Sequence, residues 1–198
     1  VFDDLRVPDK LTLQSINKVF TEIYDAWNSD TFFSLTKAFE LPTNNQIKTF
    51  SRGMRMKAAL TIALSHDAKL LILDEATAGM DVSGREHVLE ILEDYLGDDR
   101  AILISSHISE DIEQLATQLV FMRDGRIILK ESKEVLLSQY GIIDQPVEHF
   151  NISNEYLIAT RRRNDRQISL VNNYQKVPDA QPLKTIDDAT KIIMRGEV

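Results

Sequence analysis

Leu70-Leu71-Ile72-Leu73-Asp74-Glu75 is the stretch of this 198-residue chain that decides its fold. Four apolar residues without alternation are typical of a central strand in a parallel sheet, covered on both faces. We therefore expect Ile72 to be buried at mid-strand. Two carboxylates follow, at the edge where parallel sheets bind ligands. A second interpretation stays open for Asp74 and Glu75, in which the pair only ends a strand and caps a helix.

Helices and strands alternate downstream of this run. Ser83, with Glu86 three residues later, has the pattern of a capping box, and Gly97 would close that helix. A second apolar run, 101–105, predicts the next buried strand, and a helix follows from Ser109. This alternation predicts an α/β fold with a parallel sheet.

The chain divides by pattern into four segments. Residues 1–9 form a loop, residues 10–49 a helical lobe, residues 50–140 the main α/β part, and residues 141–198 a small α+β appendage. Several elements are expected within these segments. Thr12 caps a helix of the lobe, and Asp124-Gly125 forms the turn between two hairpin strands. The elements expected after them are a helix over Ser132–Tyr140, strands over Ile152–Thr160 and Gln167–Val171, and a last helix over Thr185–Met194.

Composition excludes several classes of protein. The chain has no cysteine, which excludes disulfides and thiolate metal sites and favours a reducing cytosol. A net charge of −8 argues against a general nucleic-acid binder, which needs a positive face for phosphates. The arginines at 161–163 and Arg166 are interpreted as a solvated turn, with contact to acidic lipid heads as the alternative.

Two further positions carry candidate chemistry. His107 follows the second predicted strand, where an imidazole could donate to a terminal phosphate. Phe50-Ser51-Arg52-Gly53-Met54 opens a helix, and free amides with a hydroxyl form an anion site. An ordinary serine N-cap is the alternative for Ser51.

The order and spacing of these motifs resemble the ATP-binding domain of ABC transporters over roughly residues 1–140. The matching parts are the signature motif at residues 50–54, the Walker B strand ending in Asp74-Glu75, the D-loop Ala78-Gly79-Met80-Asp81, and the switch histidine His107. The resemblance implies a P-loop NTPase-like fold whose N-terminal portion is missing here. Its Ser-x-Gly-Met form is similar to bacterial drug and peptide exporters of the bacitracin-resistance type.

The resemblance also implies roles for single residues. Asp74 would position Mg²⁺ through water, Glu75 would be the catalytic carboxylate, and His107 would contact the γ-phosphate of ATP. Asp81 would lie at a dimer interface. Asp3 stands where the family has a glutamine that contacts the metal. The signature residues that would hold the γ-phosphate of ATP on the opposite subunit are Ser51, Arg52, Gly53 and Met54.

The sequence departs from the family in two ways. The usual signature reads Leu-Ser-Gly-Gly-Gln, so Phe50, Arg52 and Met54 are substitutions. The phosphate-binding pattern Gly-x-x-x-x-Gly-Lys-Ser/Thr is absent; Gly79 and Gly84 have its spacing but lack the lysine. We therefore expect a fragment without the Walker A half, unable to bind ATP alone.

The resemblance implies partners as well. A transmembrane permease and a second ATP-binding domain are expected, at the cytoplasmic face of a bacterial membrane, with no nucleic acid. The alternatives are an ABC ATPase that does not transport, and an interaction module that binds no nucleotide.

Overall fold

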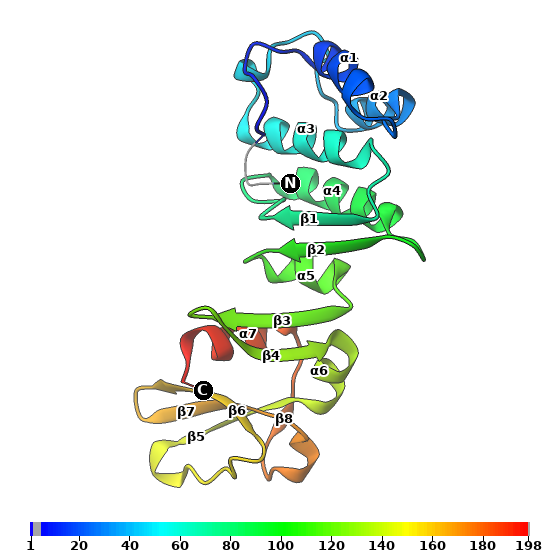
Figure 1. The fold of residues 1–198 in the computed structure, drawn as a ribbon. Helices are drawn as coiled ribbons and strands as arrows, with labels where there is room; N and C mark the ends of the chain where they lie inside the picture. Colours follow the sequence, from blue (N-terminus) through cyan, green and yellow to red (C-terminus); the bar gives the residue numbers. More distant parts are fainter. Residues whose placement is uncertain (2–4, 198) are drawn as a thin grey trace. The chain divides into compact units, whose positions relative to one another are not determined.

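The structure is a computed structural model that describes residue 1 and residues 5–197 (Figure 1). The chain forms two compact units, residues 1–107 and 108–198. Asp3, expected to contact a metal, lies outside the described residues. Among the described residues, no helix combines the length and the apolar character needed to span a bilayer.

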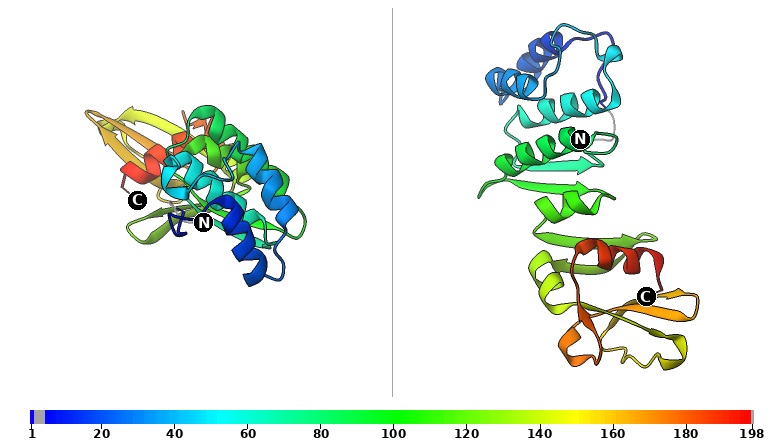
Figure 2. Two further views of the ribbon diagram at one scale, coloured as in Figure 1. Left: turned by 90° about the horizontal axis from the view of Figure 1, so that it is seen from above. Right: turned by 180° about the vertical axis from the view of Figure 1, so that it is seen from behind.

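The first unit is an α/β structure with a helical lobe, as the sequence predicts. Figures 1 and 2 show α1 and α2 grouped beside α3, and α3 running next to α4. Its elements are α1 (Leu13–Ile23), α2 (Ser29–Ala38), the 3-10 turn η1 (Ile47–Thr49), α3 (Arg52–Leu64), β1 (Leu70–Asp74), α4 (Val82–Tyr95) and β2 (Ala101–Ser105).

Capping and aromatic packing explain the helical lobe. The hydroxyl of Thr12 accepts from the amide of Ser15 at 3.2 Å and so begins α1 as expected. The ring of Trp27 lies 5.1 Å from that of Phe20 and 5.2 Å from that of Phe32, centroid to centroid. Phe32 is completely buried, so these rings form the lobe's core.

β1 and β2 pair in parallel, with Asp74 opposite Ser105 at their carboxyl ends. The side chains of Leu71 and Leu73 are buried, and α3 contributes Leu60 to the buried set. Parallel pairing in this register places the residues that follow both strands at one edge of the sheet.

The expectation that Ile72 is buried is wrong. Its side chain is 54% exposed, while that of the neighbouring Leu73 is 1% exposed. Successive side chains of a strand point to opposite faces, and only one face of the β1–β2 pair is covered in this unit. Leu70 and Leu103 are exposed on the other face with Ile72.

The predicted capping box at Ser83 and Glu86 is also wrong. The extended backbone of Asp81 turns into helix at Val82, so Asp81 is the N-cap and Ser83 lies in the first turn. The side chain of Asp81 makes no capping hydrogen bond. It lies instead over Gly84, where a Cβ would be 2.7 Å from its Oδ1.

The second unit contains a hairpin and a four-stranded antiparallel sheet in the order β6-β7-β5-β8. The hairpin and the last helix lie as predicted, but the strand expected from Ile152 begins only at Leu157, and β5 was not expected. The elements are α5 (Ser109–Leu115), β3 (Gln118–Arg123), β4 (Arg126–Ser132), α6 (Lys133–Gln139), β5 (Gly141–Pro146), η2 (Val147–His149), β6 (Leu157–Arg163), β7 (Arg166–Val171), η3 (Tyr174–Lys176), β8 (Gln181–Pro182) and α7 (Ile186–Arg195).

One apolar core joins the two parts of this unit. α7 turns Ile192 and Ile193 inward, onto a core shared with Leu119 of β3 and Leu170 of β7. The guanidinium of Arg123 donates to the carbonyl oxygens of Ile193, at 2.6 Å, and of Gly196. These bonds satisfy carbonyls that a helix end leaves without partners. The functional division of the chain into four segments stays a prediction.

Candidate active site

The ends of β1 and β2 bring three of the predicted site residues together. Asp74 is the last residue of β1, Glu75 follows it, and His107 lies two residues beyond the end of β2. The contact between Glu75 and His107 is direct: the imidazole Nδ1 lies 2.5 Å from Oε2 of the carboxylate. A carboxylate only accepts, so Nδ1–H donates and Nε2 is the ring nitrogen that can face a ligand.

The backbone of Glu75 is held in an uncommon conformation. Its φ is +52°, in the left-handed region that residues other than glycine rarely adopt. Two hydrogen bonds fix it: its amide donates to the carbonyl oxygen of Ser105, and its own carbonyl accepts from the amide of Ala78, both at 3.0 Å. Such strain costs about 1–3 kcal/mol and gathers at functional sites. The bend aims the carboxylate at His107.

Ser105 belongs to the site although the sequence did not single it out. Its hydroxyl donates to Oδ1 of Asp74 at 2.5 Å. The two residues are directly opposite in the parallel pair, and this register is the signal that identifies the contact. One oxygen of Asp74 is thereby occupied, and Oδ2 remains for another ligand.

The donor set fits Mg²⁺ held mainly by phosphates and water. Within residues 1 and 5–197, no group of three or more His, Cys, Asp and Glu side chains could hold a metal ion alone. Mg²⁺ usually keeps several waters and takes one or two carboxylates plus substrate phosphates. Asp74, oriented by Ser105, can supply such a carboxylate.

The signature residues open α3, where Ser51 is the N-cap. The hydroxyl of Ser51 accepts from the amide of Met54 at 3.2 Å, so the ordinary structural role is present. A hydroxyl that accepts in a cap still has its own O–H to donate. In the part of the chain described, no hydrogen bond or ion pair joins Ser51 to Glu75 or His107.

The D-loop lies against the start of α3. A Cβ added at Gly53 would lie 3.9 Å from the side chain of Met80, and Arg52 lies over Gly79. Asp81 ends the loop as the N-cap of α4. The structure therefore forms two groups, Asp74–Glu75–Ser105–His107 and the signature with the D-loop.

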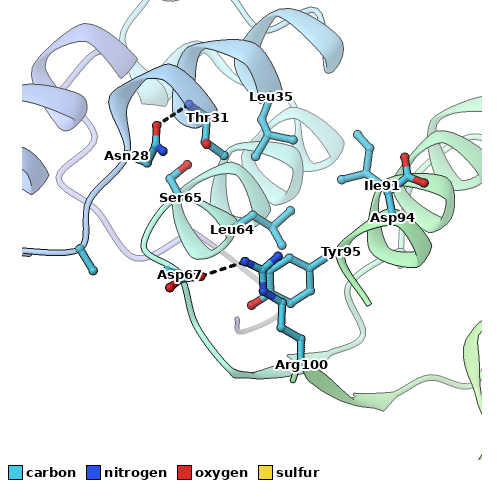
Figure 3. A pocket seen from close by; sticks show the side chains of 11 residues that line it. Asn28, Thr31, Leu35, Leu64, Ser65, Asp67, Ile91, Asp94, Tyr95 and Arg100 are labelled. Carbon is cyan, nitrogen blue, oxygen red and sulfur yellow. Dashed lines mark hydrogen bonds and ion pairs between the residues drawn. The ribbon is translucent and has the colours of Figure 1, made fainter. Parts of the chain in front are cut away.

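A pocket of about 550 Å³ lies at the opposite end of the strands (Figure 3). Asp67 and Arg100, which precede β1 and β2, form an ion pair of 2.8 Å in it. The guanidinium of Arg100 lies 4.8 Å from the ring centroid of Tyr95, whose hydroxyl donates to the carbonyl of Ala68. Burial raises the pKa of the Tyr95 phenol. The predicted catalytic residues are absent from its lining.

Comparison with known proteins agrees with the fold. Residues 4–78 match the family model described as ABC transporter. The lantibiotic transport ATP-binding protein SrtF of Streptococcus pyogenes is 37% identical over 116 residues, which cover 59% of this chain and 47% of that protein. The chain thus spans about half the length of this curated relative.

Solved structures with the same fold include ATP-binding proteins of transporters. A putative cobalt transport ATP-binding protein superposes with a TM-score of 0.62 at 18% identity, over 86% of this chain and 63% of that one. A dimeric ATP-binding cassette bound to ADP and phosphate gives a TM-score of 0.57 at 17% identity, over 66% of this chain and 61% of that one. The match over residues 4–78 and the shared fold make this chain similar to the ATP-binding domain of the ABC transporter family.

Proposed function

We propose that this chain supplies the hydrolytic strand edge of an ATP-hydrolysing subunit that powers an ABC exporter. The observation that carries the proposal is the contact between Glu75 and His107 at the tips of paired parallel strands, beside Asp74. Glu75 would orient and deprotonate the attacking water, and Nε2 of His107 would contact the γ-phosphate. Asp74 would hold Mg²⁺, which neutralises charge on the phosphates.

Of the signature residues, Ser51 and Gly53 would contact the nucleotide of a second ATP-binding subunit. The amides at the start of α3 and the hydroxyl of Ser51 suit a phosphate, since a helix N-terminus favours negative charge. Gly53 would let the phosphate approach the backbone, and Asp81 would lie at the interface. A dimeric cassette with ADP and phosphate among the structural neighbours supports this arrangement.

The names of two relatives support a role in export. A lantibiotic transport protein and a linearmycin resistance protein of Bacillus subtilis, 32% identical over 120 residues, favour an exporter. We also propose that the subunit belongs to the bacitracin-resistance-like subgroup of exporters. The subunit would bind a permease at the cytoplasmic face of a bacterial membrane, with the lobe of α1 and α2 as its contact.

The 198 residues contain no Gly-x-x-x-x-Gly-Lys-Ser/Thr pattern, so we expect the chain by itself to show no ATP affinity. A fluorescent ATP analogue titrated into this chain, and into the natural protein that contains it, checks the expectation. Absence of binding in both would favour the alternative, an interaction module without nucleotide.

Glu75→Gln in the natural protein tests the catalytic assignment. We expect hydrolysis to fall at least about a hundredfold, because the general base is lost, while ATP binding persists. His107→Ala should also slow hydrolysis severely. Glu93→Gln, on the exposed surface of α4, is the matched control and should hydrolyse normally. Near-normal turnover by Glu75→Gln would remove Glu75 from the mechanism.

A further inference from the structure

Arg52 stands where the common signature has a glycine, and its side chain lies on the D-loop. A Cβ built at Gly79 would be 3.3 Å from Cδ of Arg52, 3.5 Å from Nε and 3.7 Å from Cζ. The end of the arginine stem and the guanidinium therefore cover the α-carbon of Gly79. Gly79 also has a φ of +80°, so the backbone conformation favours glycine there, and a Cβ would make the contact with Arg52 tight.

The covered loop connects the catalytic carboxylate to α4. It begins at Glu75 and ends at Asp81, the N-cap of α4. Inside the loop the amide of Ala78 donates to the carbonyl oxygen of Glu75 at 3.0 Å. The amide of Met80 donates to the carbonyl oxygen of Thr77 at 3.2 Å. A contact on Gly79 thus restrains the turn that holds Glu75 in its left-handed conformation.

Arg52 contacts Gly79 by van der Waals packing and not by a hydrogen bond. Within the described residues its guanidinium has no hydrogen bond or ion pair, and the side chain is exposed. An arginine stem covers neighbouring surface while its charged head stays in water. The contact with Gly79 is therefore what holds this side chain against the loop.

We infer that Arg52 is a positioning residue. Packed on Gly79, it fixes the loop 76–81 against the start of α3 and so keeps the backbone of Glu75 in place. The effect on hydrolysis rests on the function proposed above, but the effect on the loop does not.

Hydrogen exchange of the natural protein tests the contact. Arg52→Ala removes the stem and keeps helix propensity, so the amides of Ala78 and Met80 should exchange at least about tenfold faster, which corresponds to about 1.4 kcal/mol of local opening. The amide of Leu41, bonded to the carbonyl of Thr36 in the helical lobe, should keep its rate. Unchanged exchange at Ala78 and Met80 would overturn the inference.

A second variant separates packing from charge. Arg52→Met keeps a long stem without donors and should restore most of the protection that Arg52→Ala loses. Exchange as fast as in Arg52→Ala would assign the effect to charge and overturn the packing role. Gly79→Ala should disturb the loop more in the wild-type background than with Arg52→Ala, because the contact with Arg52 is then gone; equal effects would contradict the contact.

Steady-state hydrolysis distinguishes positioning from nucleotide binding. Arg52→Ala should lower kcat with KM for ATP unchanged, and Arg52→Met should recover part of the lost kcat. A raised KM with unchanged kcat would make Arg52 a nucleotide ligand and overturn positioning. A wild-type protein that hydrolyses no ATP would remove the proposed function, while the exchange rates would still decide the role of Arg52.

Discussion

The hydroxyl of Ser105 is bound to Oδ1 of Asp74 at 2.5 Å, across two strands that run in parallel. The bond engages Oδ1 and leaves Oδ2 as the carboxylate oxygen that would hold the proposed Mg²⁺. Hydrogen bonds of this kind orient ligating carboxylates, and their loss typically costs 10–100-fold in metal affinity or activity.

Ser105→Ala in the natural protein should therefore raise the Mg²⁺ concentration for half-maximal ATP hydrolysis by about tenfold. Ser105→Thr keeps the hydroxyl and should restore the wild-type requirement. Mn²⁺ binding, followed by electron paramagnetic resonance in the presence of ATP, should weaken in the alanine variant alone. An unchanged Mg²⁺ dependence would mean that Asp74 needs no orientation by Ser105.

Glu75→Gly should abolish hydrolysis yet spare the fold. Glycine adopts a φ of +52° without strain, so the free energy of unfolding should rise by about 1 kcal/mol. Glu90→Gly, in α4, is the matched control and should lower it by about 1 kcal/mol. Urea unfolding of both variants measures the difference. A Glu75→Gly variant as unstable as the control would show that the left-handed backbone carries no strain.

Ile72→Asp and Leu73→Asp should differ sharply in this chain, although the residues are neighbours. Ile72 is exposed, so its change should cost no more than about 1 kcal/mol, from β-propensity. Leu73 is buried, and an unpaired carboxylate there should unfold the first unit. Circular dichroism of the two variants decides. Loss of structure in both would show that the outer face of β1 is covered after all.

Tyr140 should make the second unit sensitive to alkali. Burial, with the nearby charge of Glu131 adding to it, raises the pKa of its phenol to about 12. In the unfolded chain the phenol ionises near the ordinary tyrosine pKa of 10.0, so the stabilisation is complete below that pH and is lost as pH rises toward 12.

Tyr140→Phe should show a smaller fall in unfolding free energy between those two pH values. The other tyrosines and lysines titrate in both proteins, so the difference between the two curves isolates Tyr140. Parallel curves would mean that Tyr140 ionises in the folded protein as it does in the unfolded chain.

The sequence predicts the strand tips well, because an apolar run followed by polar residues marks the end of a strand wherever the strand lies. It fails on Ile72, because an unbroken apolar run does not say which face the rest of the unit covers. It misses β5, because half of that strand is Asp144, Gln145 and Pro146, and aspartate and proline are uncommon in strands. The pairing of Ser105 with Asp74 is hidden for another reason: it depends on the register between segments far apart in the chain.

The contact between Arg123 and the end of α7 has a consequence for synthesis. Arg123 emerges from the ribosome long before Ile193 and Gly196, whose carbonyl oxygens it binds. Until those residues appear, β3 lacks the helix that completes its apolar core. The nascent hairpin must remain soluble while the apolar face of β3 is uncovered. Exposed apolar surface of this kind promotes aggregation until α7 has been synthesised, and chaperones protect such surfaces.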